Sequence, residues 1–361
     1  MSGSGRADIV AFAERLLELL DQGSFQTTYK YAVLLGLMDL CVEHTSAKGA
    51  APTSVTTRQL AEKVLELYWS HARPFDPERR PDLLQGKTGE AEILQRIRRF
   101  RTESAADPFA TLAQARRANA RGFERLTAFV EWKLIEMPLP RLQFFGSVDL
   151  RFVYEIGWDV KVRRTDTLDG FDNRILFVEG PSDSLVRLAG LLRPLVQRQW
   201  AAMVARLNKL VDAQLEEFLF GVDRADLAPI RGQLRELQGG RCFYCDATIR
   251  ADACVDHFMP WARYPDNGIH NLVLADGRCN GDKSAFLAAP EHLARWIARA
   301  TERAADLEQI ALRAKWDAHP ARTLSIARAI YLRLPSEAKL WRGRGAFVDA
   351  DRARIAAMLV A

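Results

Sequence analysis

The chain has 361 residues, of which 48% are hydrophobic and 27% are charged, and its formal net charge is +5. This length predicts two or three domains, and the composition excludes a disordered, collagen-like or low-complexity chain. A basic excess of this size, spread over a large surface, is compatible with a polyanionic partner such as nucleic acid but does not require one.

Residues 1–20 lack the basic leader, apolar run and small-residue cleavage site of a secretory signal. The longest apolar stretch, 31–42, is interrupted by Asp39 and is far shorter than the roughly 20 residues of a membrane span. We therefore expect a cytoplasmic protein with no membrane contact. Because that compartment is reducing, the five cysteines, four of them between positions 242 and 279, favour metal binding over disulfides.

The N-terminal third of the chain is predicted to be mostly helical. Apolar residues recur at helical spacing, and helices are expected over 8–20, 29–43, 58–72, 90–101 and 110–136. Prolines at 138 and 140 end this region. It forms the first predicted domain, 1–137, which could be winged-helix-like because TTRQLAEKVLELYW resembles the second and third helices of such modules.

The second predicted domain, 138–235, begins with three short strands rich in aromatic and β-branched residues, RLQFF, RFVYEIGW and RILFVEG. A helical segment is then expected from near Ser182 to about Phe220. Pro194 is expected to interrupt it, because proline removes a backbone donor and its ring collides with the preceding turn.

A cysteine-rich block, 236–290, forms the third predicted domain, and a mostly helical extension, 291–361, forms the fourth. The expected fold class is therefore α+β and mostly helical. The sequence contains no internal repeat.

The residues that carry chemistry lie in RCFYCDATIRADACVDHFMPWARYPDNGIHNLVLADGRCNGDKSAFL, residues 241–287. Cys242 and Cys245 form a C-x-x-C pair, a spacing that lets two thiolates reach one zinc ion at tetrahedral angles. Cys279, with Asp276 three residues before it, supplies a second half of the site. A carboxylate oxygen can bind zinc, so a Cys3Asp site is one option; a three-ligand site and His270 as substitute are the others. Asp276 could equally cap a helix.

Local structure can bring several polar residues of this block together. CVDHF and NLVLA are predicted strands, and GRCNGDKSAFL is a predicted short helix on which Asn280 and Lys283 share one face. Adjacent residues of a regular strand point to opposite sides, so Asp256 and His257 can serve one site only if the strand ends or bends there.

The pattern resembles the HNH nucleases, a family with a ββα-metal fold. Its signature is C-x-x-C, D-H-x-x-P, N-L and C-x-x-C-N-x-x-K. Here D-H-x-x-P begins at Asp256, N-L is Asn271 and Leu272, and the ending runs from Cys279 to Lys283. The sequence departs from the family where Asp276 stands in place of the usual third cysteine.

The resemblance implies a site and its cofactors. Asp256 and Asn280 would hold a catalytic Mg²⁺ or Mn²⁺, and His257 would act as general base. Asn271 would orient the loop between the strands, while Lys283 and Arg278 would contact phosphate. A structural zinc would be held by Cys242, Cys245, Cys279 and Asp276.

A second basic feature lies outside this block. Four arginines on one predicted helix, Arg96, Arg98, Arg99 and Arg101, form either a face that tracks nucleic-acid phosphates or an ordinary solvated face.

The resemblance implies a metal-dependent endonuclease that hydrolyses phosphodiester bonds of DNA, with RNA as the other substrate, in restriction or anti-phage defence. Two alternatives stay open. One is a zinc-stabilised module that binds nucleic acid without cleaving it. The other is a nuclease held inactive by a partner or ligand through its N-terminal region. A homodimer or a regulatory partner is compatible with each hypothesis.

Overall fold

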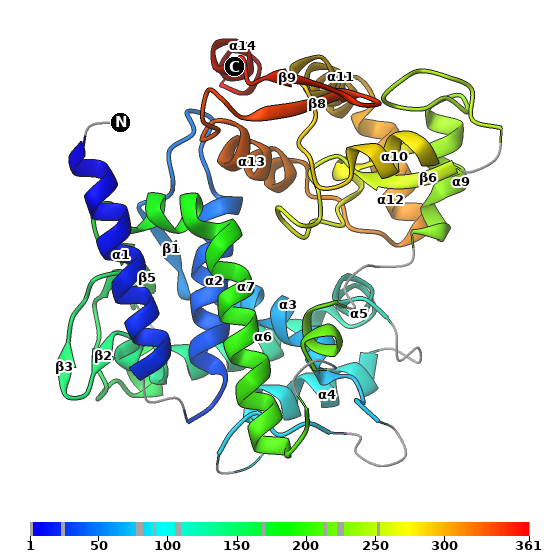
Figure 1. The fold of residues 1–361 in the computed structure, drawn as a ribbon. Helices are drawn as coiled ribbons and strands as arrows, with labels where there is room; N and C mark the ends of the chain where they lie inside the picture. The colour runs from blue at the N-terminus through cyan, green and yellow to red at the C-terminus, as the bar shows by residue number, and fades with distance from the viewer. Residues whose placement is uncertain are drawn as a thin grey trace. The chain divides into compact units, whose positions relative to one another are not determined.

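The computed structural model describes residues 3–22, 26–76, 82–87, 89, 91–104, 110–167, 170–211, 215–221, 227–250 and 253–360. The chain forms two compact units (Figure 1). The first contains residues 1–42 and 51–222, and the second contains residues 43–50 and 223–361. We had expected four segments; the change of unit near residue 222 lies somewhat before the expected boundary at 235.

The first unit is mostly helical and carries two small antiparallel sheets, one of order β1-β5-β4 and one formed by the hairpin β2-β3. Its helices are α1 (Gly3–Gln22), α2 (Tyr29–Glu43), α3 (Thr57–Trp69), η1 (Ser70–Ala72), α4 (Glu92–Ser104), α5 (Leu112–Ala118), α6 (Ala120–Glu136), η2 (Leu139–Arg141), η3 (Arg164–Thr167), α7 (Pro181–Asn208) and η4 (Glu217–Gly221). Its strands are β1 (Ser54–Thr56), β2 (Phe144–Phe145), β3 (Val148–Asp149), β4 (Tyr154–Ile156) and β5 (Arg174–Phe177).

Local sequence explains where α3 begins. Thr56 accepts a hydrogen bond from the backbone N–H of Gln59, and the Gln59 side chain accepts one from the backbone N–H of Thr56. This reciprocal capping box satisfies two backbone donors at the start of the helix. The helix then buries Leu60, Val64 and Tyr68 at helical spacing, which confirms the expected amphipathic element.

The expected interruption at Pro194 is wrong, because α7 runs from Pro181 to Asn208 with this proline inside it. A proline inside a helix removes one backbone hydrogen bond, and its ring approaches the carbonyl four residues earlier, here that of Gly190. Burial of Leu192, Val196 and Trp200 on one face stabilises the continuous helix against the lost hydrogen bond.

The second unit surrounds the cysteine-rich block with helices (Figure 1). Its elements are α9 (Ala228–Leu237), β6 (Ala253–His257), η5 (Ile269–Asn271), β7 (Leu272–Asp276), α10 (Gly277–Lys283), α11 (Pro290–Glu302), α12 (Ala304–Ala314), α13 (Pro320–Tyr331), β8 (Lys339–Gly343), β9 (Ala346–Asp349) and α14 (Arg352–Leu359). The strands pair as two antiparallel hairpins, β6-β7 and β8-β9. The α+β, mostly helical fold class is confirmed, and no described helix is long and apolar enough to span a membrane.

One hydrophobic core runs through the second unit, from Ile230 in α9 to Leu359 in α14. Helix α11 contributes most visibly to it. The indole of Trp296 stacks on Phe258 with the ring centroids 4.8 Å apart, and its Nε1 donates to the backbone oxygen of His270. Residues after 290 therefore belong to the same core as the cysteine-rich block.

The segment 43–50 joins this unit through Glu43, the last residue of α2. Its buried carboxylate accepts a hydrogen bond from the hydroxyl of Tyr264 and forms an ion pair with Arg322 at 2.9 Å. The loop between β6 and β7, which contains Tyr264, is thereby anchored to both α13 and the end of α2.

We predict that Trp296→Ala destabilises the second unit by about 3–5 kcal/mol, because it removes a fully buried aromatic ring and leaves a cavity. Urea unfolding followed by far-UV circular dichroism measures the change. Leu312→Ala, at a position 73% exposed on the same unit, is the matched control and is expected to change stability by less than about 0.5 kcal/mol. An equally small change for Trp296→Ala would contradict the shared core.

Candidate active site

The predicted ββα arrangement is present in the second unit. Strand β6 pairs with β7 in antiparallel register, with Asp256 opposite Val273 and His257 opposite Leu272, and α10 follows β7 directly. Strand β6 ends at His257. The strand therefore ends where Asp256 and His257 stand next to each other, which is the condition under which both can serve one site.

Asp256 is 8% exposed and lies in a polar cluster with two partners on the same oxygen. Its Oδ2 is 3.0 Å from Nζ of Lys283 and accepts a hydrogen bond of 2.5 Å from the hydroxyl of Tyr244. Burial and the neighbouring carboxylate raise the pKa of Tyr244 well above its usual value, so the phenol keeps its proton and donates. The lysine charge lies opposite the carboxylate and compensates it.

Lys283 is placed differently from its expected role. Its side chain is 0% exposed, and Nζ also donates to the backbone oxygen of His257 at 2.9 Å. Burial lowers its pKa and the Asp256 carboxylate opposes that shift. The buried ammonium group thus connects the end of β6 to α10. A direct contact with substrate phosphate would require an exposed ammonium group, which this geometry does not provide.

His257 is half-buried and its ring is oriented by two neighbours. Nε2 lies 2.9 Å from Oδ1 of Asn267, and the ring centroid is 5.3 Å from that of Trp261. Because an amide oxygen only accepts, Nε2 carries the proton and Nδ1 is the basic nitrogen. Burial lowers the pKa of His257, against the opposing effect of the Asn267 hydrogen bond, so the neutral imidazole is favoured near pH 7.

Asn271 holds the loop that supplies Asn267. Its Oδ1 accepts from the backbone N–H of Met259, and its Nδ2 donates to the backbone oxygens of Met259 and Asp266. The Asn271 side chain is fully buried and therefore orients the loop rather than touching substrate. Asp266 adds a second support, since its Oδ2 accepts from the hydroxyl of Thr323 in α13.

The residues expected to hold the catalytic cation offer hard oxygen atoms. Oδ1 of Asp256 accepts no hydrogen bond from a described residue, and the half-buried Asn280 amide makes no side-chain hydrogen bond within the described part of the chain. Carboxylate and amide oxygens are the ligands that Mg²⁺ and Mn²⁺ prefer. Arg278 is exposed on α10, where it can reach solvent and a polyanion.

Three cysteines form the second metal centre. The sulfur atoms of Cys242, Cys245 and Cys279 lie within 4.8 Å of one another, and they are the one group of this kind among the described residues. Burial and the two neighbouring thiols raise the pKa of Cys279, so this thiol keeps its proton near pH 7 unless a cation binds the sulfur. The donor set and its compactness fit zinc.

Asp276 lies beside this cluster but is not a member of it. Its side chain caps α10 by accepting a hydrogen bond of 2.9 Å from the backbone N–H of Arg278. Its backbone N–H points to Sγ of Cys242 at 3.3 Å. Of the two roles expected from the sequence, the structure shows the capping role. His270 is buried elsewhere and also lies outside the cluster.

The arginine run on α4 does not form one basic face. At 100° per residue, Arg96 and Arg99 lie on one side of the helix and Arg98 and Arg101 on the other. Arg98 forms an ion pair with Asp82, Arg99 pairs with Glu103, and Arg101 stacks over the ring of Trp69. Intramolecular contacts thus use most of the charge that was expected to face nucleic acid.

Two residues of the site were missed by sequence reasoning, Asn267 and Tyr244. Tyr244 lies inside the C-x-x-C pair, where its spacing gives no indication of a contact with Asp256 twelve residues later. Asn267 lies in an irregular loop whose path depends on buried hydrogen bonds. An amide flanked by aspartate and glycine is a common turn signal, so nothing local distinguishes it.

With this geometry in place, the comparison with known families is specific. Residues 242–289 match the family model described as HNH endonuclease, a segment that begins at the first cysteine of the cluster and ends where α11 starts. The three-cysteine cluster fits the zinc-stabilised subtype. No curated protein and no solved structure matches the chain. The segment is thus an HNH endonuclease domain, which indicates nuclease activity on nucleic acid.

We predict that the protein binds one zinc ion through the three thiolates. Cys279→Ser is expected to lose the metal and to unfold at lower urea concentration, because the ββα segment is too small to be stable without it. Zinc content by mass spectrometry and urea unfolding measure both effects. Cys254→Ser, outside the cluster, is the matched control and should keep the zinc.

Asp276→Ala sharpens this test. Loss of a cap costs about 1 kcal/mol and leaves the zinc content unchanged. Loss of zinc in this variant would show instead that the carboxylate moves to the metal.

We also predict that Asn267 sets the pH dependence of the site. In Asn267→Asp, the new carboxylate stabilises the imidazolium and raises the pKa of His257. If the neutral ring is the base for cleavage, the acid limb of the pH–rate profile moves to higher pH. Asn267→Ala should lower the cleavage rate by part of the roughly 10²–10⁴-fold that a general base contributes. Superimposable profiles for wild type and Asn267→Asp would contradict this role.

Proposed function

We propose that the protein is a metal-dependent endonuclease that hydrolyses phosphodiester bonds of DNA, with His257 as general base. The observation that carries this proposal is the hydrogen bond between Nε2 of His257 and Oδ1 of Asn267. It leaves Nδ1 basic at the end of the strand that also presents the Asp256 carboxyl group. A base and a metal-binding carboxylate on adjacent residues suit hydrolysis of a phosphate diester.

Asp256 and Asn280 would hold the catalytic Mg²⁺ or Mn²⁺. Such a cation, when bound, stabilises negative charge on the phosphate and on the leaving oxygen. The chain supplies the rest. Lys283 holds the Asp256 side chain through their 3.0 Å ion pair, and Tyr244 fixes the rotamer of that carboxylate by donating to Oδ2.

His257 would take a proton from the attacking water at Nδ1. The half-buried ring favours the neutral form, and Asn267 prevents the ring from rotating away from the substrate. Arg278, exposed on α10 two residues before Asn280, is suited to contact a phosphate that neighbours the cleaved one.

Double-stranded DNA in the cytoplasm is the substrate that the family resemblance favours, with RNA as the alternative, and restriction or anti-phage defence is the corresponding biological role. The zinc centre contributes no chemistry in this scheme. It holds the start of the ββα segment against β7, through the backbone N–H of Asp276 that faces Sγ of Cys242.

We predict that the full chain cuts circular plasmid DNA with Mg²⁺ or Mn²⁺, and that His257→Ala lowers the rate by about 10²–10⁴-fold, because the water loses its base. Gel electrophoresis of supercoiled, linear, single-stranded and RNA substrates measures cleavage. His319→Ala, an exposed histidine of the same unit, is the matched control and should cut as wild type does.

Two results would replace this proposal. If wild type and His257→Ala both shift the nucleic acid on a gel and both leave it intact, the protein is a binding module. If the full chain is inert until a cellular partner or small molecule is added, it is a restrained nuclease.

A further inference from the structure

The C-terminal hairpin β8-β9 is fixed to the helix that carries Asn280. Nε1 of Trp341 donates to Oδ2 of Asp282 at 2.7 Å, and the backbone N–H of Gly345 donates to the same oxygen at 3.0 Å. Asp282 lies between Asn280 and Lys283 on α10. The hairpin follows the segment matched to the HNH family, so it is an addition that this chain makes to that segment.

Aromatic contacts connect the hairpin to the candidate metal ligand. Trp341 is fully buried, and its ring lies edge-on to Tyr244 with centroids 5.1 Å apart. The hydroxyl of Tyr244 donates to Asp256. Two side chains therefore separate the hairpin from the carboxylate at the centre of the site.

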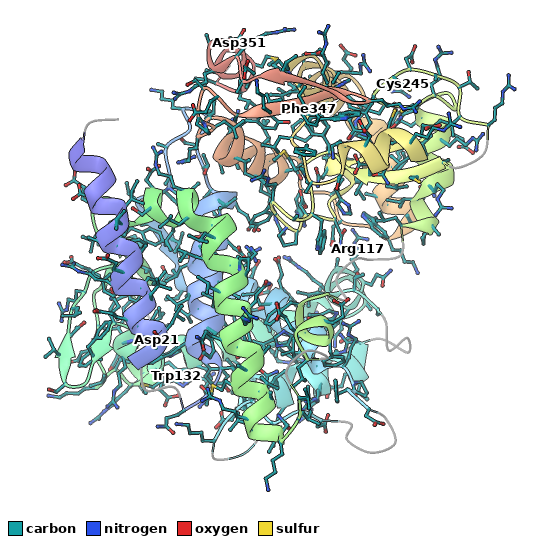
Figure 2. The ribbon with its side chains drawn as sticks, viewed as in Figure 1. Asp21, Arg117, Trp132, Cys245, Phe347 and Asp351 are labelled. Atoms are coloured by element: carbon teal, nitrogen blue, oxygen red, sulfur yellow. The ribbon has the colours of Figure 1, made fainter. Side chains whose placement is uncertain are left out.

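An aromatic pair is exposed where the hairpin meets the end of α10. Phe347 lies opposite Trp341 in the β8-β9 register, and Phe286 follows Lys283 by three residues. Their ring centroids are 4.9 Å apart at 73°, and the two residues remain 42% and 44% exposed (Figure 2 labels Phe347). The two rings form a small exposed aromatic patch, in contrast to the buried Trp341.

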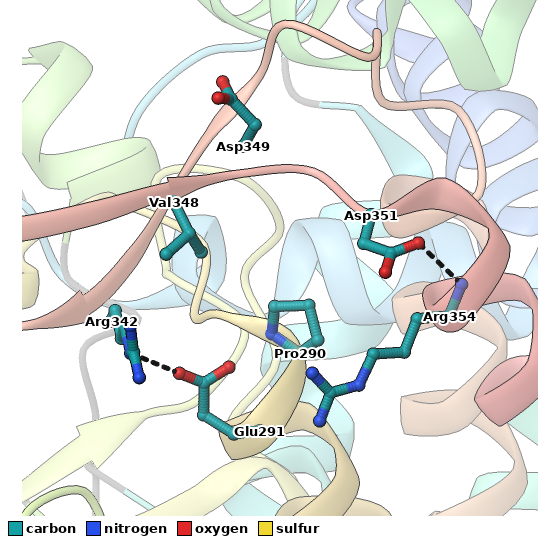
Figure 3. Close-up of a pocket in the computed structure, with 7 residues that line it drawn as sticks. All are labelled: Pro290, Glu291, Arg342, Val348, Asp349, Asp351 and Arg354. Carbon is teal, nitrogen blue, oxygen red and sulfur yellow. Dashed lines mark hydrogen bonds and ion pairs between the residues drawn. The ribbon is translucent and has the colours of Figure 1, made fainter.

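The hairpin adds a positive charge at its exposed turn, Arg344, which, after the hydrogen bonds from Trp341 and Gly345, helps to lower the pKa of Asp282. Arg342 is paired with Glu291 at 3.0 Å in the pocket of Figure 3, and Lys339 is paired with Asp349. Arg344, at the exposed tip, forms no salt bridge with a described residue. Gly345 has a φ of 67°, which allows the tight turn that presents this side chain.

We propose that Phe286, Phe347 and Arg344 form a nucleotide-binding surface beside the active site, which stacks an unpaired base on the rings and binds its phosphate through the guanidinium. Exposed aromatic rings next to a cation are the combination that binds single strands, because every base has a face to stack. Bases in a duplex are already stacked on each other, so this surface selects single-stranded or locally opened nucleic acid. This surface would bind substrate for the proposed nuclease, so the inference rests on that proposed function.

The test is equilibrium binding of the full, zinc-loaded chain to a fluorescein-labelled oligothymidine and to a duplex of equal length, without Mg²⁺ or Mn²⁺. Phe286→Ala and Phe347→Ala should each weaken binding of the single strand about 5- to 100-fold and affect the duplex less. Arg344→Ala should make the slope of log affinity against log salt concentration shallower by about one, which corresponds to the loss of one phosphate contact. Leu312→Ala, which removes an exposed apolar side chain on α12, should bind as wild type does.

Because the test measures binding and not cleavage, it distinguishes this inference from the nuclease proposal. Wild-type affinity in both phenylalanine variants, equal losses on both substrates, or no oligothymidine binding by wild type would overturn the surface, whether or not the protein cuts DNA. Selective loss of single-strand binding would support it even if no substrate were cleaved. Arg344→Ala alters only the exposed tip, so its salt dependence decides the question if either phenylalanine variant fails to fold.

Discussion

The ammonium group of Lys283 is the interaction on which the site depends. It lies fully buried between the carboxylate of Asp256 and the backbone oxygen of His257, and it comes from the last turn of α10. Burying one charge costs several kcal/mol, and this cost is offset only if the opposite charge and the carbonyl stay in place. The end of β6 and the helix are therefore locked together, and the two adjacent polar residues keep a fixed relation to Asn280.

The ββα segment is too small to maintain this arrangement by itself, and the second unit supports it from two sides. Three thiolates gather at its start, where Cys279 of α10 meets the C-x-x-C pair. At the other side, α11 buries Trp296 against Phe258, and the guanidinium of Arg299 donates to the backbone oxygens of His270 and Leu272. The C-terminal elements thus belong to the same unit as the HNH segment, and the exposed face of the hairpin β8-β9 becomes part of the surroundings of the candidate site.

Sequence reasoning succeeded where short-range spacing controls geometry. The strands β6 and β7, the helix α10 and the C-x-x-C pair all follow from patterns within a few residues, and the motif spacing added Cys279 to the pair. It failed at Pro194, because tertiary burial of one helix face outweighed the local preference for a break. It also gave Lys283 a role at the surface, since a lysine in a motif shows its charge but not its burial. The partners Tyr244 and Asn267 come from segments whose approach depends on the folded loop.

The sequence by itself indicated the family of the site, because cysteine, aspartate, histidine and asparagine at these spacings resemble the HNH nucleases, and residues 242–289 match the HNH endonuclease family model. Tertiary structure decided how those groups are used. It set which nitrogen of His257 is basic and assigned Asp276 to the cap of α10. It also paired the arginines of α4 within the first unit while leaving Arg344 exposed. The reason is that residue type and spacing fix which bonds a side chain can form, whereas burial and partners distant in the sequence fix which of those bonds it does form.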